Sequence, residues 1–224
     1  MEKPEIKREN VDKVYDGRFV RVMDLNYAPG KHYLVATRRD IEDLTTLKSD
    51  AEFRSMLPDA VTIFPIVRTP GEEPRLLLNY EYRYPAGQFL LSPPAGLTDP
   101  EDRMNAHPLF ETAVREILEE TGIKVKASDR VFEISPLVFS TPGMSDESNA
   151  LVGMVLDLAD LSCLKQTGAV GTECFNGFET VTKEEARVLL REGRDKYGNY
   201  YSMYTWAAMM YFVSDMWEGQ EDER

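Results

Sequence analysis

The stretch REILEETGI at residues 115–123 decides how this chain is interpreted, because it combines a helical pattern with a dense group of carboxylates. Glu116, Glu119 and Glu120 stand at i, i+3 and i+4, and this spacing brings them to one helical face. Apolar residues recur at helical spacing upstream, and a glycine follows the acidic group. We therefore predict a helix over residues 109–121 with one acidic face, which we expect to be open to solvent.

Three carboxylates this close together repel one another, at a cost of about a few tenths of a kcal/mol per pair on a helix surface. A hard cation such as Mg²⁺ removes that cost by taking oxygen ligands from the acidic face. A solvated acidic face paired with Arg115 explains the run equally simply, because a charge run usually carries no function. Both interpretations stay open on these residues alone.

The segment before the predicted helix favours the cation. Residues 60–67 and 75–84 have the composition of two neighbouring strands, and PPAGLTD at residues 93–99 forms a proline- and glycine-rich loop. A strand, a glycine loop and an acidic helix in this order are typical of sites for phosphate and metal.

At this point the residues resemble the Nudix box, whose second half reads Arg-Glu-apolar-x-Glu-Glu-x-Gly-apolar and matches residues 115–123 throughout. The first half departs from the family pattern. The family Glu position holds His107, and the plausible loop glycine, Gly96, comes five residues too early. We infer a five-residue insertion within residues 100–106, with the family Glu either lost to His107 or replaced in space by Glu101 or Glu111.

Further segments resemble the ADP-ribose pyrophosphatase branch of that family, and the resemblance covers about residues 13–215. They are VYDGRFV at residues 14–20, YRYP at 82–85, PAGL at 94–97 and STPGMSDE at 140–147. A family Glu that usually precedes the Pro-Ala-Gly by two residues is replaced by Ser92.

The resemblance implies an α/β protein with the Nudix fold, an α/β/α sandwich with a mixed sheet, plus an N-terminal β-rich dimerisation module. We assign residues 1–58 to that module, 59–217 to the Nudix domain and 218–224 to an acidic tail. The implied activity is Mg²⁺-dependent hydrolysis, with Mn²⁺ as a possible substitute, of the diphosphate bond of ADP-ribose or another ADP-sugar, giving AMP and a sugar phosphate. The alternative is a Nudix-fold module that binds a nucleotide sugar without cleaving it.

The resemblance also implies roles for residues around the helix. Glu116 and Glu120 are the first-choice metal ligands, Glu119 is a further or water-mediated ligand with a catalytic role, and the Ala95 carbonyl completes a site. Arg115 is expected to orient a carboxylate.

A general base is expected from the glycine-bearing segment at residues 168–177, where Glu173 is the candidate, with Glu179 and Glu147 as alternatives. Arg83 is a candidate for binding a substrate phosphate, and Glu147 for binding substrate.

The composition sets the remaining expectations. The chain has 224 residues, 42% of them apolar and 29% charged, which predicts a folded core. A net charge of −13 argues against nucleic acid and anionic lipid as partners. The apolar stretch at residues 200–217 is interrupted by polar side chains, and the N-terminus has no apolar segment, so we expect a cytoplasmic protein. The resemblance implies that it is a homodimer through its N-terminal strands.

The other expected elements follow from periodicity and turn signals. We predict a hairpin-like module over residues 13–38 with a turn at 28–31, and strands at 131–139 and 150–158. A capping box opens a helix over residues 182–190, and a last helix covers 201–217.

Overall fold

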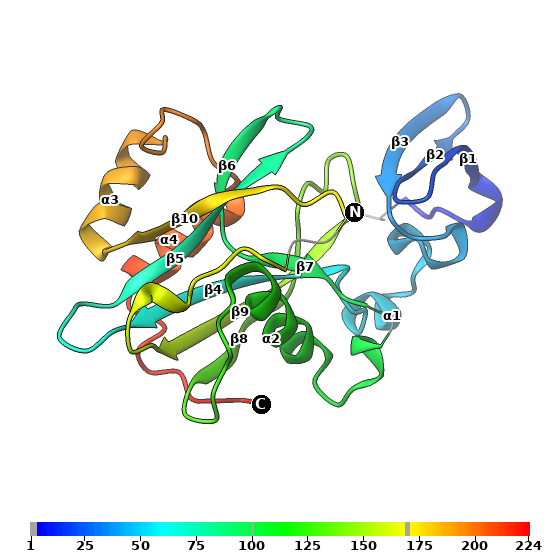
Figure 1. The fold of residues 1–224 in the computed structure, drawn as a ribbon. Helices are drawn as coiled ribbons and strands as arrows, with labels where there is room; N and C mark the ends of the chain where they lie inside the picture. Colours follow the sequence, from blue (N-terminus) through cyan, green and yellow to red (C-terminus); the bar gives the residue numbers. More distant parts are fainter. Residues whose placement is uncertain (1–3, 100, 169–170) are drawn as a thin grey trace. The chain divides into compact units, whose positions relative to one another are not determined.

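The computed structural model describes residues 4–99, 101–168 and 171–224, and its chain divides into two compact units (Figure 1). The first unit comprises Met1–Asp59 and Pro136–Asn149, and the second comprises Ala60–Ser135 and Ala150–Arg224. The assignment of functional domains stays a prediction. The compact units differ from it in one respect, because Pro136–Asn149 belongs to the first unit although it lies within residues 59–217.

The first unit is built on a three-stranded antiparallel sheet of β1 (Val11–Asp16), β2 (Arg21–Ala28) and β3 (Lys31–Thr37). Its apolar core is formed by Val11, Met23, Leu25, Ile41 and Leu44. The turn predicted at residues 28–31 is confirmed, since Ala28 pairs with Lys31. Three 3₁₀ helices, η1 (Arg8–Asn10), η2 (Ile41–Asp43) and η3 (Thr45–Leu47), and the short helix α1 (Asp50–Arg54) complete the unit.

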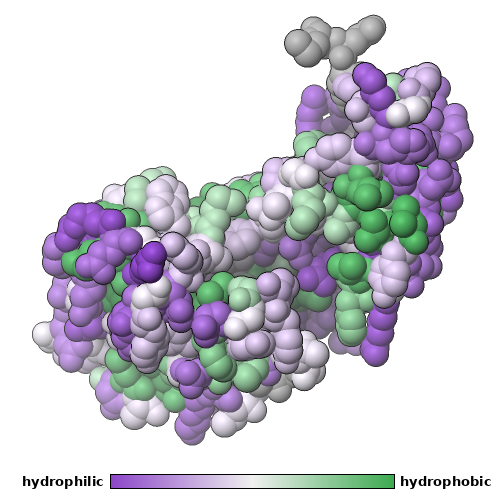
Figure 2. All heavy atoms as spheres, turned by 90° about the horizontal axis from the view of Figure 1, so that it is seen from above, coloured by the Kyte–Doolittle hydropathy of each residue, from purple (hydrophilic) through white to green (hydrophobic). Residues whose placement is uncertain are grey.

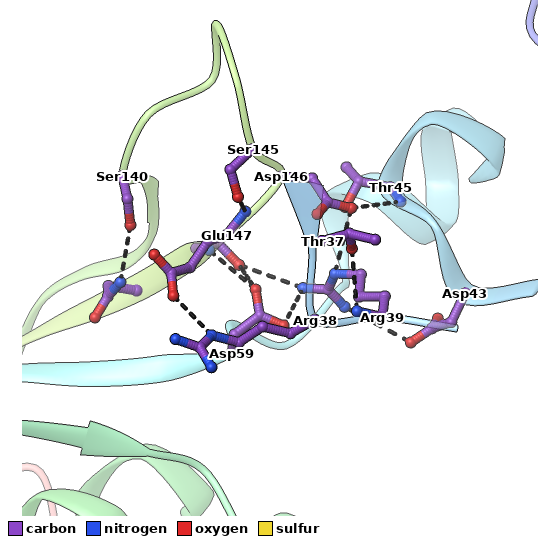
Figure 3. A network of polar contacts seen from close by, with 12 residues as sticks. Thr37, Arg38, Arg39, Asp43, Thr45, Asp59, Ser140, Ser145, Asp146 and Glu147 are labelled. Carbon is purple, nitrogen blue, oxygen red and sulfur yellow. Dashed lines mark hydrogen bonds and ion pairs between the residues drawn. The ribbon is translucent and has the colours of Figure 1, made fainter. Parts of the chain in front are cut away.

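A buried polar network holds the loop at residues 140–147 within the first unit (Figure 3). The Arg39 guanidinium lies 2.9 Å from the Asp59 carboxylate, and both side chains are less than a tenth exposed. Asp59 also accepts hydrogen bonds from the backbone N–H and the hydroxyl of Ser148, at 2.9 and 3.0 Å. Asp146 accepts from the backbone N–H of Thr45 at 3.2 Å. Removing one partner of such a buried ion pair usually costs about 3–5 kcal/mol, so the loop is firmly attached.

The second unit contains most of a seven-stranded sheet with the order β10-β5-β4-β9-β8, in which β6 pairs with β5 and β7 pairs with β4. The strands are β4 (Ala60–Arg68), β5 (Arg75–Arg83), β6 (Gln88–Ser92), β7 (Ala95–Leu97), β8 (Arg130–Phe139), β9 (Ser148–Asp157) and β10 (Phe175–Val181). The four longest strands, β4, β5, β8 and β9, confirm the predicted ones. The shorter β6, β7 and β10 were not predicted, because a few residues carry too little periodicity.

Helices cover both faces of this sheet (Figure 1). The helix α2 (Pro108–Thr121) packs Ala113 and Ile117 against one face, whose apolar side chains include Val61 and Val152. The helices α3 (Lys183–Glu192) and α4 (Met203–Val213) pack against the other face, where Phe64 is fully buried. Each fully buried side chain of this size contributes about 1.5–3 kcal/mol to stability, so the layers hold each other together. The predicted α/β/α sandwich with a mixed sheet and a separate N-terminal sheet is confirmed.

The predicted helix ends agree with the structure at α2 and differ from it at α4. The predicted helix at residues 109–121 matches α2, and the helix predicted at 201–217 ends at Val213. Two short 3₁₀ helices, η4 (Asp102–Met104) and η5 (Leu161–Cys163), lie in connecting segments. No helix of the described residues has the length and apolar character needed to cross a bilayer.

The alternation of side chains along β5 brings polar groups to the α2 face of the sheet. Leu76, Leu78 and Tyr80 belong to the core under α3 and α4, whereas Leu77 belongs to the core under α2. Because strand side chains alternate between faces, the side chains at positions 79 and 81 share the face of Leu77.

Candidate active site

The two carboxylates of α2 that we expect to hold a metal are buried rather than open to solvent. Glu116 is 5% exposed and Glu120 is 3% exposed, whereas the side chain of Glu119 is 37% exposed. The expectation of a solvent-facing acidic helix is therefore wrong for Glu116 and Glu120. The reason is that β5 and β7 contribute groups that contact these carboxylates directly.

Glu120 is held by two donors from the sheet. The backbone N–H of Ala95 donates to one carboxylate oxygen at 3.1 Å, and the side-chain amide of Asn79 donates to the other. Asn79 is 1% exposed and lies on the face of β5 described above. Each carboxylate oxygen retains a further lone pair that could bind a metal ion. The two hydrogen bonds would hold such a ligand in a fixed orientation.

Gly96 lies against Glu116 so closely that a side chain does not fit. A Cβ atom placed on Gly96 would lie 1.8 Å from a carboxylate oxygen of Glu116, where ordinary contact begins at 3.4 Å. The glycine of the Pro-Ala-Gly segment thus makes room for the buried carboxylate.

Burial changes the acidity of these carboxyl groups. Loss of hydration raises the pKa of Glu116 to about 7, although the neighbouring Arg115 acts in the opposite direction. Burial also raises the pKa of Glu120 well above its ordinary range, against the hydrogen bond from Ala95, and raises the pKa of Glu81. Buried carboxylates without enough positive charge nearby bind protons or cations more strongly.

Arg115 contacts two of the three helix carboxylates. Its Nη1 donates to Glu116 at 2.7 Å and to Glu119 at 3.2 Å, while its Nη2 donates to the Leu97 carbonyl at 3.0 Å and to Asp102 at 2.9 Å. This arrangement supports the predicted orienting role, which stays a prediction.

Asp102 is a residue that the sequence analysis missed. Glu101 and Glu111, which we considered as spatial replacements for the family Glu, are both exposed, whereas Asp102 is 9% exposed and contacts Arg115. His107 is the N-cap residue of α2 and stacks on Phe110, with ring centres 6.0 Å apart. Within the predicted insertion, Pro100 lies outside the described residues.

Glu173 lies just before β10, and its charge acts on the site. The negative charge of Glu173 contributes to the raised pKa values of Glu81, Glu116 and Glu120. The role of Glu173 as the base stays a prediction.

The segment that carries Glu173 is fixed at both ends. The Gln166 side chain exchanges two hydrogen bonds with the Gly177 backbone, at 2.7 and 3.1 Å. A Cβ atom on Gly168 would lie 2.3 Å from the carbonyl oxygen of Glu119, so this end packs against α2. Ala169 and Val170, also within the predicted loop, lie outside the described residues.

Glu179, an alternative candidate for the general base, lies on the other face of the sheet. Glu179 pairs in register with Leu78, contacts Tyr80 and forms an ion pair with Lys196, which places it on the α3 face of the sheet and away from α2. The structure therefore does not bring this alternative base to the site.

The two candidates for substrate binding each have an ionic partner. Arg83, at the end of β5, forms an ion pair of 2.6 Å with Glu81. Glu147 belongs to the first unit, where Arg38 donates to it at 2.7 Å.

The donor set at α2 fits a hard divalent cation. Among the described residues, no three histidine, cysteine, aspartate or glutamate side chains form a cage that would hold a metal without help. Mg²⁺ does not require such a cage, because it keeps several waters and is often held by one or two carboxylates together with substrate phosphates. Glu116 and Glu120 are oxygen donors of that kind.

Comparison with known proteins agrees with this geometry, although no family model matches the chain. A putative Nudix hydrolase 2 of Caenorhabditis elegans is 36% identical over 99 residues, covering 44% of this chain and 40% of that protein. An ADP-sugar pyrophosphatase of Mus musculus is 30% identical over 99 residues, covering 44% of this chain and 41% of that protein. This chain thus matches about two fifths of the length of these curated relatives.

The similarity to solved structures extends over the whole fold. The crystal structure of an ADP compounds hydrolase aligns with a TM-score of 0.59 and 19% identity, covering 98% of this chain and 97% of that one. The fold and the matched sequence confirm the resemblance to Nudix hydrolases that residues 115–123 predict. Within that class, the similarity to a pyrophosphatase of ADP-sugars agrees with the predicted branch.

Proposed function

We propose that this chain hydrolyses the diphosphate bond of ADP-ribose or another ADP-sugar in the presence of Mg²⁺, giving AMP and a sugar phosphate. The observation that carries this proposal is the pair of buried carboxylates, Glu116 and Glu120, oriented by Arg115 and by the Ala95 N–H. The similarity to an ADP-sugar pyrophosphatase supports the choice of substrate class.

Glu116 and Glu120 would hold the cation directly, and Glu119, which is more exposed, would reach it through a water. When bound, the cation neutralises charge on the diphosphate and lowers the pKa of a bound water. The Ala95 carbonyl stays a proposed further ligand. The observed contact of this residue is made by its N–H, which orients Glu120.

Glu173 would accept the proton of the attacking water. It is exposed between a turn and β10, and its charge acts on Glu116 and Glu120, as a base at this site requires. Arg83 would bind a substrate phosphate through its guanidinium, exchanging its contact with Glu81 for one with the phosphate.

We also propose that the chain is a homodimer through its N-terminal sheet. Val14, Phe19 and Leu34 are between 59% and 67% exposed on β1, β3 and the loop between β1 and β2. Hydrophobic side chains reach the surface among hydrophilic ones (Figure 2). Exposed apolar side chains that gather into a large patch are typical of a subunit interface.

Screening the purified protein against ADP-ribose, other ADP-sugars, dinucleotides and nucleoside triphosphates tests the proposed reaction. We expect AMP to be released from an ADP-sugar with Mg²⁺ and not with a chelator. The Glu120→Gln protein is the control for contaminating hydrolases. Tight binding of an ADP-sugar without turnover would favour the alternative of a binding module. The sequence arguments for that alternative are the altered first half of the Nudix box and the serine at position 92.

A further inference from the structure

The inserted segment before α2 supplies a buried carboxylate to the site. Asp102 lies in η4 and is 9% exposed, although its neighbours at positions 101 and 105 are exposed. It accepts hydrogen bonds from Arg115 at 2.9 Å, from the Thr112 hydroxyl at 3.0 Å and from the Asp99 backbone N–H at 3.2 Å. A carboxylate with three donors is held in one orientation.

We propose that Asp102 is a positioning residue that holds Arg115 so that Glu116 keeps an oxygen available for a cation. The inference rests on the proposed cation site at Glu116 and Glu120. It concerns how this chain arranges the site despite having no carboxylate at position 107.

The argument starts from the shape of the guanidinium group. Its donors are fixed in one plane, so holding one nitrogen restricts the position of the other. Asp102 and the Leu97 carbonyl hold Nη2, and Nη1 then reaches Glu116 and Glu119 from one side. The lone pairs of Glu116 that Arg115 does not contact stay available to a cation.

Loss of the negative charge at position 102 would change how Arg115 is held. Nη2 would retain the Leu97 carbonyl and a weaker contact with Asp99, whose carboxylate lies 3.4 Å away and is 59% exposed. The positive charge of Arg115 would then act on Glu116 without its buried counter-charge. Because a guanidinium and a metal cation compete for the same carboxylate, cation binding should weaken.

Asp102 also attaches the inserted loop to α2 through Thr112. A purely structural role through this contact would change stability but not cation affinity. The two roles can therefore be separated by measuring Mn²⁺ binding directly, without substrate, by electron paramagnetic resonance.

We expect Asp102→Asn to weaken Mn²⁺ binding by about tenfold or more, the usual effect of losing a partner of a metal ligand. Asp102→Glu, which keeps the charge, should recover part of the affinity. Glu101→Gln is the matched control, since it removes one negative charge from the same loop at an exposed side chain. Thr112→Val should lower the melting temperature and leave Mn²⁺ affinity within about twofold of the wild type.

A double-mutant cycle tests the route through Arg115. If Asp102 acts through this residue, adding Asp102→Asn to Arg115→Gln should cause no further loss of Mn²⁺ affinity, whereas independent effects would add. If Asp102→Asn does not fold, Arg115→Lys takes its place, because it keeps the charge and cannot reach both partners. The same tenfold loss is expected.

Unchanged Mn²⁺ affinity in Asp102→Asn, or in Arg115→Lys if that variant is used, would overturn the inference, and so would additive losses in the cycle. A wild-type protein that binds Mn²⁺ with this dependence on Asp102 but hydrolyses no ADP-sugar would instead refute the proposed reaction. The wild-type measurements thus distinguish a failure of the inference about Asp102 from a failure of the proposed reaction.

Discussion

Replacing Gly96 by alanine is the most direct perturbation of the candidate metal site, because it adds one methyl group and removes no charge. The new Cβ would lie 1.8 Å from one Glu116 oxygen, 1.9 Å from the carboxyl carbon and 2.4 Å from the other oxygen. Ordinary contact begins at 3.4 Å, so the carboxylate or the strand has to move. The methyl group therefore displaces the carboxylate that we propose as a ligand.

The size of the effect follows from that displacement. The carboxylate must shift by more than about 1 Å, and a misplacement of that order costs about 10²-fold in rate when it disturbs catalytic geometry. The same clash should destabilise the fold by about 1–3 kcal/mol, the usual cost of overpacking a well-packed site. We expect Gly96→Ala to lose about 10²-fold in kcat for ADP-sugar hydrolysis and to bind Mn²⁺ more weakly.

The assay compares Gly96→Ala with Gly219→Ala, whose new Cβ would meet no atom within 4 Å. Turnover at saturating Mg²⁺, Mn²⁺ affinity and urea unfolding are measured for both. Gly219→Ala should match the wild type in all three. A folded Gly96→Ala protein with wild-type turnover and wild-type Mn²⁺ affinity would refute the assignment of Glu116 as a ligand.

The remaining predictions use single substitutions. Glu120→Gln should lose at least about 10²-fold in kcat and keep its circular dichroism spectrum, since the glutamine oxygen can accept from the Ala95 N–H while its amide donates to the oxygen of a flipped Asn79 amide; full activity would contradict the metal site. Glu173→Gln should lower kcat by about 10²-fold with KM and Mn²⁺ affinity unchanged, while recovery at high Mg²⁺ would identify a ligand rather than a base. Phe19→Asp should give a monomer in light scattering, and a persistent dimer would argue against the N-terminal interface. Without a bound cation, the pKa of Glu116 is about 7 in the folded state, whereas the unfolded chain releases this proton near pH 4.5. Between these two values the folded state binds one more proton than the unfolded chain. In the presence of a chelator, the melting temperature should therefore fall as pH rises from about 5 to 7. Glu116→Gln should flatten that fall, and an equally steep one would contradict the burial of this charge.

The sequence predicted the parts of the molecule that depend on local pattern. The helical spacing at residues 109–121 and the glycine after it suffice to place α2, because both signals lie within a few turns of chain. The long strands β4, β5, β8 and β9 were predicted for the same reason. The family pattern then indicated Glu116 and Glu120, which the structure places together.

Burial and partners in the site could not be predicted in the same way. Asp102 reaches Arg115 only because the segment before α2 folds back on this helix, and a single sequence carries no signal for that contact. The burial of Glu116 likewise depends on β7 packing next to α2 at Gly96. Both contacts join residues that are separated in the chain, so they require the tertiary fold.

Asn79 and Glu81 show how the core and the site determine each other. Position 92, where the family usually has a glutamate, pairs in register with Asn79, and the amide of Asn79 donates to Glu120. A slip of β5 by one residue would turn Asn79 and Glu81 into the apolar core and Leu78 toward Glu120. The apolar residues at positions 76, 78 and 80 prevent that slip, because each is buried under α3 and α4. The packing on one face of the sheet therefore fixes the polar groups that orient the metal-binding carboxylate on the other.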